Sequence, residues 1–346
     1  LKDYYSNLNK EFHEINFNGI AFNSNLVKKN YIFFAIKGNN LDGNKYIKNA
    51  IKNGSKIIIS AKVKERLENN ILYLKNKNPR KLLAEFAVKL NNRHPNNLVA
   101  VTGTNGKSSI ANFYYQILKL NKKKVSSIGT LGIEGINYKN NISNTTYDPI
   151  VLNNILTILK KKNINNVILE ASSHGLKQHR LDGLKFNLGI FTNLSRDHLD
   201  YHKTYKDYFD SKLILFKKLM KKKSNIIFDQ DLTIANKISK IAKKNNLKQL
   251  SIGSNNSDLV VIDHKFLNFN QHVRIFYKNN IYNFSTQLIG KVQINNLLMA
   301  ILAASKSNLK LKKIINSIEK IKPVPGRLEK ISNLKNNSTV ILDYAH

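Results

Sequence analysis

The fold of this chain is decided by the stretch Asn97-Leu98-Val99-Ala100-Val101-Thr102-Gly103-Thr104-Asn105-Gly106-Lys107-Ser108-Ser109, which joins an apolar strand to a helix through two glycines. Its first five residues predict a short strand. After the stretch, apolar residues recur at helical spacing, namely Ile110, Phe113, Tyr114, Ile117 and Leu118. Strand, glycine turn and helix therefore follow one another, as in a loop that binds nucleotide phosphates.

The chemistry of this turn suits a nucleoside triphosphate. Glycines let backbone N–H groups close around phosphate oxygens, and the helix N-terminus adds positive potential. Lys107 would neutralise phosphate charge, and the Ser108 hydroxyl would bind Mg²⁺. We therefore predict a nucleotide-binding loop formed by Thr104, Asn105, Gly106, Lys107, Ser108 and Ser109. The alternative is an ordinary glycine turn before a helix, because Val101 stands where the general phosphate-loop pattern has its first glycine.

Length and composition limit the possible classes of protein. The 346 residues exceed one typical domain, and 42% hydrophobic residues indicate a folded globular protein. The absence of cysteine excludes disulfides and thiolate metal sites, which leaves oxygen and nitrogen ligands and favours Mg²⁺. The sequence lacks both an apolar run of about 18 residues and an N-terminal signal-peptide pattern. We expect a cytoplasmic monomer without membrane insertion.

The net charge of +35 would ordinarily indicate a nucleic-acid partner. Almost all of this charge comes from lysines that are spread along the chain among Asn and Ile, as in residues 76–78 and 160–163. Such a distribution is more typical of a compositional bias than of a binding stripe. We predict no specific nucleic-acid partner and only nonspecific attraction to polyanions at low salt.

Two domains are predicted, at residues 1–95 and 96–346, with a linker around residues 91–96. The first is a small α/β domain, with strands at residues 31–36 and 56–59 and a helix at residues 81–87. The second alternates strands with helices, which predicts a mainly parallel sheet with helices on both faces. Its expected strands include residues 97–101, 167–169, 189–191, 226–228 and 340–342. Residues 271–277 and 281–284 predict an inserted hairpin.

Polar residues follow these strands, at the edge where parallel sheets bind ligands. Glu170 ends one strand and is placed to bind Mg²⁺ shared with a nucleotide, although alone it would pass for a solvated strand end. Residues 171–180 then gather hydroxyls, imidazoles, an amide and a guanidinium, which suits a polyanionic substrate. Residues 191–202 form a second polar cluster, in which His198 could coordinate a second Mg²⁺.

These motifs together resemble the Mur ligase family along nearly the whole chain. The resemblance rests on Thr102–Lys107, on the loop with Ser172, His174, Gln178 and Arg180, and on Thr192–Asp200. Among Mur ligases the sequence is most similar to those that add the third amino acid to the peptidoglycan precursor. Residues 21–25 look like the uridine-binding first domain, with Ser24 between Asn23 and Asn25 where the family usually has Asp and Arg.

The resemblance implies roles for further residues. In the family, a carbamylated lysine helps to bind the second Mg²⁺, and Lys212 matches its position; by itself Lys212 would pass for a surface lysine. Residues 290–296 resemble the motif whose last residue, here Asn296, contacts adenine, with Val292 and Gln293 replacing Phe and Asn. Arg327 would contact phosphate and Asp343 would lie near ribose. Thr145, Thr146, Ser172, Gln178 and Arg180 would position the muramoyl peptide, with Tyr147 replacing a proline of the family motif.

The implied reaction is ATP-driven amide formation through an acyl phosphate, which adds diaminopimelate or lysine to UDP-N-acetylmuramoyl-L-Ala-D-Glu. The catalytic residues would be Lys107, Glu170, His198 and Lys212. Ser108 and Glu170 would bind the first Mg²⁺, and His198 and carbamylated Lys212 the second. ATP and Mg²⁺ are thus the expected cofactors.

Two alternatives stay open. One is another Mur-type or folylpolyglutamate-type ligase, against which the loop of residues 172–180 argues. The other is a degenerate nucleotide-binding scaffold or regulatory protein. Mur ligases also have a C-terminal third domain that binds the amino acid, and the sequence stops at His346 before it. We therefore expect a fragment without that domain, which would bind ATP and the UDP substrate but ligate little.

Overall fold

The computed structural model describes residues 1–2, 5, 10–38, 41–138, 144–267, 270–333 and 339–344. The chain divides into two compact units. The first unit comprises Leu1–His94, Tyr147–Ile158 and Gln178–Leu184, and the second comprises Pro95–Thr146, Leu159–Lys177 and Lys185–His346. The main break lies one residue before the predicted boundary, but two later segments that the sequence assigned to the second domain belong to the first unit. They do so because Ile150 packs on its core and Gly183 lies against Val88.

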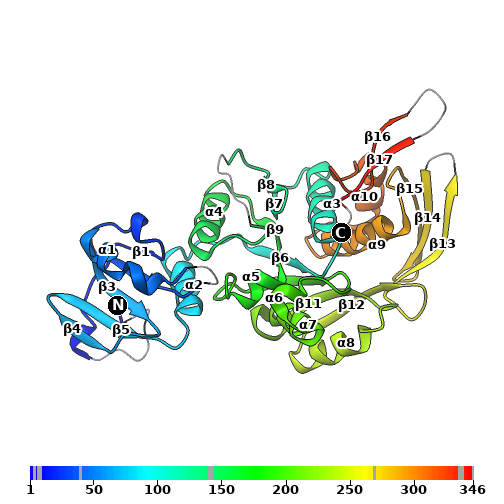
Figure 1. Cartoon of the computed structure of the whole chain (residues 1–346). Coiled ribbons are helices and arrows are strands. Elements are labelled where there is room, and N and C mark those ends of the chain that lie inside the picture. Colours follow the sequence, from blue (N-terminus) through cyan, green and yellow to red (C-terminus); the bar gives the residue numbers. More distant parts are fainter. Residues whose placement is uncertain are drawn as a thin grey trace. The chain divides into compact units, whose positions relative to one another are not determined.

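A five-stranded sheet forms the centre of the first unit, in the order β1-β2-β3-β5-β4 (Figure 1). Its strands are β1 (Gly19–Ala21), β2 (Tyr31–Ala35), β3 (Ser55–Ser60), β4 (Arg66–Glu68) and β5 (Ile71–Lys75), and its helices are α1 (Ile47–Lys52) and α2 (Pro79–Leu90). The alternation of β2 explains the layers. Phe34 packs with Phe86 of α2 on one face, and Phe33 packs with Ala50 of α1 on the other.

A ten-stranded sheet forms the centre of the second unit, in the order β15-β14-β13-β12-β11-β10-β6-β9-β7-β8. Its strands are β6 (Asn97–Thr102), β7 (Val125–Gly129), β8 (Gly132–Glu134), β9 (Asn166–Glu170), β10 (Phe186–Phe191), β11 (Met220–Asp229), β12 (Lys248–Gly253), β13 (Leu259–Leu267), β14 (Asn270–Tyr277) and β15 (Asn280–Thr286). Neighbours from β13 through β7 pair in parallel, which confirms the predicted parallel-dominated α/β fold. The predicted hairpin is also confirmed, as antiparallel β14 and β15.

Helices cover the two faces of this sheet. Figure 1 shows α3 (Lys107–Leu120) and α9 (Lys291–Ser305) on the side opposite α7 (Tyr205–Ile214) and α8 (Ala235–Lys244). The remaining α-helices are α4 (Pro149–Lys161), α5 (Ser173–Lys177), α6 (Leu199–His202) and α10 (Leu311–Ile315). Val99, Val101, Phe113 and Leu297 belong to one buried cluster, which fixes the start of α3 relative to the sheet. Among the described residues, we find no helix with the length and apolarity that a membrane crossing requires.

One predicted strand was assigned to the wrong sheet. Residues 340–342 belong to β17 (Thr339–Leu342), which pairs antiparallel with β16 (Glu329–Asn333) in a separate two-stranded sheet. The side chains of Val340, Ile341 and Leu342 are exposed rather than covered by helices. Because antiparallel strands need only a short connection, this apolar run pairs with its neighbour in sequence instead of entering the parallel sheet.

Candidate active site

A cleft of about 450 Å³ opens in the second unit where β6, β9 and β10 end. Most residues singled out from the sequence line it, namely Thr104, Asn105, Gly106, Lys107, Ser108, Ser109, Thr145, Glu170, Ser172, His198, Lys212 and Arg327. These residues come from segments more than 200 positions apart in the chain, so the topology of the sheet brings them together.

The turn between β6 and α3 requires both of its glycines. Gly103 has φ +149° and Gly106 has φ +84°, values that other residues rarely adopt. A side chain at Gly103 would overlap Thr192, and one at Gly106 would overlap Asn296. The Asn105 N–H donates to Asn193 Oδ1 at 2.9 Å, which ties the turn to the segment after β10. The turn is therefore a close-fitting cradle of the kind that receives phosphate oxygens.

Lys107 folds back over this turn. Its Nζ donates to the carbonyl oxygens of Gly103 at 3.1 Å and Thr104 at 2.6 Å. Burial lowers the pKa of Lys107, while the carboxylates of Glu170 and Asp197 act in the opposite direction. The ammonium group is thus held beside the cradle, with two carboxylates favouring its charged form.

Glu170, the last residue of β9, is held by hydroxyl and backbone donors. Ser108 Oγ donates to its Oε2 at 3.0 Å, Thr130 N donates to its Oε1 at 2.9 Å, and Thr130 Oγ1 also reaches Oε2 at 3.2 Å. Burial raises the pKa of this carboxyl, and Lys107 acts against that effect. A buried carboxylate beside a hydroxyl is the oxygen donor set that Mg²⁺ prefers.

No group of three or more His, Asp or Glu side chains in the described part of the chain is arranged to hold a metal by itself. This suits Mg²⁺, which proteins usually bind through one or two carboxylates together with the phosphates of the substrate and water. The residues around Glu170 therefore fit an ion shared with a nucleotide better than a closed metal site.

Lys212 is 1% exposed and lies on the inner side of α7. Its Nζ donates to Gly103 O at 2.7 Å, the same carbonyl that Lys107 contacts. Burial and, to a lesser extent, the nearby charge of Lys107 together lower the pKa of Lys212 to about 6, against the opposite effect of Asp197. The amine is therefore largely uncharged at neutral pH, which is the form that reacts with CO₂.

His198 lies at the rim of the same cleft, with its side chain about half exposed. It adopts left-handed backbone geometry with φ +53°, and its Nε2 lies 3.6 Å from Asp197 Oδ2. The ring packs edge-on against His174 and Tyr208, with centroid distances of 4.9 Å and 6.1 Å. His198 and Lys212 thus both contact the ring of Tyr208.

The predicted substrate threonines connect to the end of β9, the strand that carries Glu170. Thr146 Oγ1 donates to Glu170 O at 2.8 Å and accepts from Ser172 N at 2.9 Å. Thr145 Oγ1 lies within hydrogen-bond distance of Thr130 Oγ1, at 3.1 Å. These contacts fix the segment before α4 to the end of β9.

Other predicted residues lie elsewhere. Ser24, Gln178 and Arg180 belong to the first unit, where Arg180 Nη2 donates to Gln178 Oε1 at 2.8 Å and Asn49 Nδ2 donates to Ser24 Oγ at 2.9 Å. Asn296 is 5% exposed and packs against Gly106 without lining the cleft. Asp343 accepts from Leu328 N at 3.2 Å, and the end of its motif, Ala345-His346, lies outside the described residues.

Several residues that line the cleft received no role from the sequence, among them Thr130, Asp197 and Tyr208. Asp197 was part of a recognised polar cluster but received no role. Tyr208 stands four residues before Lys212, the spacing that places two side chains on one face of a helix, and this signal was available. Thr130 carries no such local signal, because its importance comes from its contact with Glu170.

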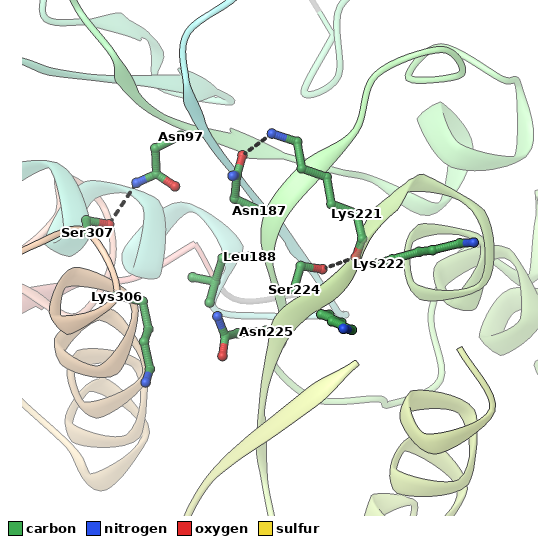
Figure 2. A pocket seen from close by; sticks show the side chains of 10 residues that line it. Asn97, Asn187, Leu188, Lys221, Lys222, Ser224, Asn225, Lys306 and Ser307 are labelled. Atoms are coloured by element: carbon green, nitrogen blue, oxygen red, sulfur yellow. Dashed lines mark hydrogen bonds between the residues drawn. The ribbon is translucent and has the colours of Figure 1, made fainter. Parts of the chain in front are cut away.

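A second cleft, of about 320 Å³, lies in the same unit and differs from the first in how its charged side chains are arranged. It is lined by four lysines and several amides, including Asn97 and Asn187. Figure 2 shows Lys222 and Lys306 extending to different sides, while Lys221 turns to Asn187. The charges do not converge on a common point, so this cleft offers no comparable chemistry.

Comparison with known proteins decides the family. The sequence matches the Mur ligase middle domain over residues 101–304 and the catalytic domain of the Mur ligase family over residues 16–89. A UDP-N-acetylmuramoyl-L-alanyl-D-glutamate–2,6-diaminopimelate ligase from Rickettsia typhi is 35% identical over 344 residues, 98% of this chain and 68% of that protein. The chain belongs to the Mur ligase family. The membership predicted from the motifs is confirmed.

Other Mur ligases agree with this assignment. The ligase of the same name from Mesorhizobium japonicum is 34% identical over 329 residues, 95% of this chain and 68% of that protein. A solved structure with that name has a TM-score of 0.82 at 27% identity, covering 97% of this chain and 70% of the other. The structure of a MurF ligase from Thermotoga maritima in complex with ADP has a TM-score of 0.63 at 19% identity over 91% of this chain and 68% of that one, which supports the fold.

Proposed function

We propose that this Mur ligase uses ATP to join an amino acid to UDP-N-acetylmuramoyl-L-alanyl-D-glutamate in peptidoglycan precursor synthesis. The names of the relatives favour 2,6-diaminopimelate over lysine as the incoming amino acid. The observation that carries the proposal is the convergence of Lys107, Ser108, Glu170 and Lys212 in one cleft at the ends of parallel strands. Such a cleft combines a phosphate cradle with oxygen ligands for Mg²⁺.

The reaction would proceed in two displacements. A carboxylate of the substrate attacks the γ-phosphorus of ATP, so an acyl phosphate forms and ADP leaves. The amino group of the incoming amino acid then attacks the acyl carbon, and inorganic phosphate leaves as the amide forms. No residue of the protein needs to act as a nucleophile, because phosphoryl transfer depends mainly on positioning and charge neutralisation.

The residues of the cleft would divide these tasks. Lys107 and Arg327 neutralise phosphate charge, and the backbone N–H groups of the turn at Gly106 orient the phosphates. When bound, Mg²⁺ would supply further charge neutralisation, one ion held by Ser108 and Glu170 and another by His198 and carbamylated Lys212. Thr130 keeps the Glu170 carboxylate oriented through its two hydrogen bonds. Thr145, Thr146 and Ser172 would face the muramoyl peptide.

The carbamate on Lys212 would form without an enzyme-derived reagent. The lone pair of the neutral amine attacks the carbon of CO₂, one C=O π bond becomes the carboxylate, and one proton goes to solvent. Carbamylation thus replaces an amine that would repel Mg²⁺ when protonated with an anion that attracts it. The burial that lowers the pKa of Lys212 to about 6 favours this exchange.

Calorimetric titration tests the proposal against a degenerate scaffold. A ligase binds both the Mg²⁺ complex of a non-hydrolysable ATP analogue and UDP-N-acetylmuramoyl-dipeptide, whereas a scaffold that has lost the site binds neither. Lys107→Ala is expected to lose the ATP analogue and keep the UDP substrate, while Lys123→Ala, an exposed lysine after the same helix, keeps both. If Lys107→Ala still bound both ligands, the assignment of the phosphate site would be wrong.

A further inference from the structure

None of the roles assigned above involves Tyr208, although this residue lies beside the candidate site. It lies in α7, is 1% exposed and is one of the residues that line the cleft. The hydroxyl donates to Thr104 Oγ1 at 3.1 Å.

The partner of this hydroxyl is a junction in the phosphate loop. Thr104 N donates to Asn193 O at 3.0 Å, and Thr104 Oγ1 accepts from Ser195 N at 3.0 Å as well as from Tyr208. Thr104 therefore joins three segments: the loop before α3, the segment after β10, and α7. Removing one of these contacts would loosen the loop where it faces the nucleotide.

The ring of Tyr208 serves a second set of contacts. Lys212 Nζ lies 4.1 Å from the ring centroid, one helical turn further along α7. That Nζ also donates to Gly103 O, the residue before Thr104. The helix thus contacts two adjacent residues of the loop, Gly103 through Lys212 and Thr104 through Tyr208. The same ring makes a T-shaped contact with His198.

A buried tyrosine with a satisfied hydroxyl is common in protein cores, and packing alone would explain its ring. Packing does not explain the choice of partner. The hydroxyl donates its hydrogen bond to a side chain of the nucleotide loop, and the ring contacts Lys212 and His198 of the candidate metal site as well as His202, at a centroid distance of 5.1 Å.

We propose that Tyr208 is a positioning residue that couples the phosphate loop to the second metal site, through its hydroxyl on Thr104 and its ring against Lys212 and His198. This inference rests on the proposed function, because it assigns a role in binding ATP. Tyr208 contacts no reacting atom in this role; it holds the groups that do.

The experiment compares two ligands by calorimetry in matched variants. Tyr208→Phe removes the hydroxyl and keeps the ring, and the loss of one such hydrogen bond is expected to weaken binding of the Mg²⁺–ATP analogue about two- to tenfold. Binding of UDP-N-acetylmuramoyl-dipeptide stays unchanged. Tyr205→Phe, on the exposed side of the same helix, changes neither affinity.

A double-mutant cycle separates this role from general damage. Thr104→Val removes the other partner, so Thr104→Val with Tyr208→Phe is expected to bind the analogue no more weakly than Thr104→Val alone. The ring is tested by NMR with ¹³C-bicarbonate: the carbamate signal of Lys212 persists in Tyr208→Phe and falls in Tyr208→Leu. Thermal unfolding of each variant checks that it folds.

The outcomes distinguish the two proposals. If the wild type binds the ATP analogue and Tyr208→Phe binds it equally well, the positioning role is overturned while the proposed function stands. Equal weakening of both ligands, or additive effects of the two substitutions, also overturns it. If the wild type binds neither ligand, the proposed function falls and this inference falls with it.

Discussion

The most informative single residue is Lys212, because its charge state links stability to the proposed chemistry. Burial lowers its pKa to about 6 in the folded chain, whereas an unfolded lysine titrates near 10.4. Between these values the unfolded state binds the extra proton, so this group makes the folded chain more stable as pH rises from about 6 towards 10. Below about pH 6 both states are protonated, so the stability of the folded chain is lowered by the whole free-energy cost of burying a charged ammonium group.

Lys212→Met is therefore expected to stabilise the folded chain in CO₂-free buffer, most strongly at and below pH 6 and progressively less as the pH rises. Melting temperatures from calorimetry between pH 5.5 and 9 measure this difference. Lys206→Met, an exposed lysine on the same helix, serves as the control and should show a flat difference across the range. A gain in stability that grows with pH would contradict the assigned sign.

Glu170 gives a second prediction at this scale. Glu170→Gln keeps the shape of the side chain and one acceptor for Thr130, but it removes the negative charge beside Ser108. We expect binding of the ATP analogue to depend less on Mg²⁺ than in the wild type, measured by titration with and without the metal. Glu134→Gln, on β8 away from the cleft, should leave that dependence intact. An unchanged response to Mg²⁺ in Glu170→Gln would remove Glu170 from the metal site.

At the scale of elements, sequence patterns predicted best where the periodicity was long and local. The step from β6 through the glycine turn to α3 and the hairpin of β14 and β15 followed from such patterns. The prediction for residues 340–342 was wrong because a run of three apolar residues is compatible with any sheet. Only pairing with β16 decides which sheet they join. The contacts of Thr130 could not be predicted for the same reason, since a hydrogen bond to Glu170, 40 positions away, leaves no pattern in the sequence.

The glycine turn supplies a prediction with a matched control. Gly106 and Gly132 have similar left-handed geometry, with φ +84° and φ +89°, but a side chain would overlap Asn296 at the first and meet open space at the second. Substitution by Ala costs about 1–2 kcal/mol of backbone strain at either position. Gly106→Ala is additionally expected to weaken the ATP analogue more than tenfold, because the cradle must shift; Gly132→Ala should not. Equal affinities in the two variants would show that the cradle does not bind phosphate.

The whole molecule carries a net charge of +35, and the consequence is repulsion within the folded chain. Salt screens such repulsion over a Debye length of about 10 Å at 0.1 M. The melting temperature should therefore rise when the ionic strength increases from about 20 mM, where screening is weaker, to about 200 mM, where it is stronger. Salt screens the charges of the nucleotide site less than those at the surface, because they are buried.

Chloride salts of sodium and choline should raise the melting temperature equally if screening is the cause. Sulfate at matched ionic strength tests for specific anion binding, since an extra gain with sulfate that Lys107→Ala abolishes would come from the phosphate cradle and not from net charge. A melting temperature that is independent of chloride concentration would mean that the 57 basic residues are spread widely enough to leave the fold without net internal repulsion.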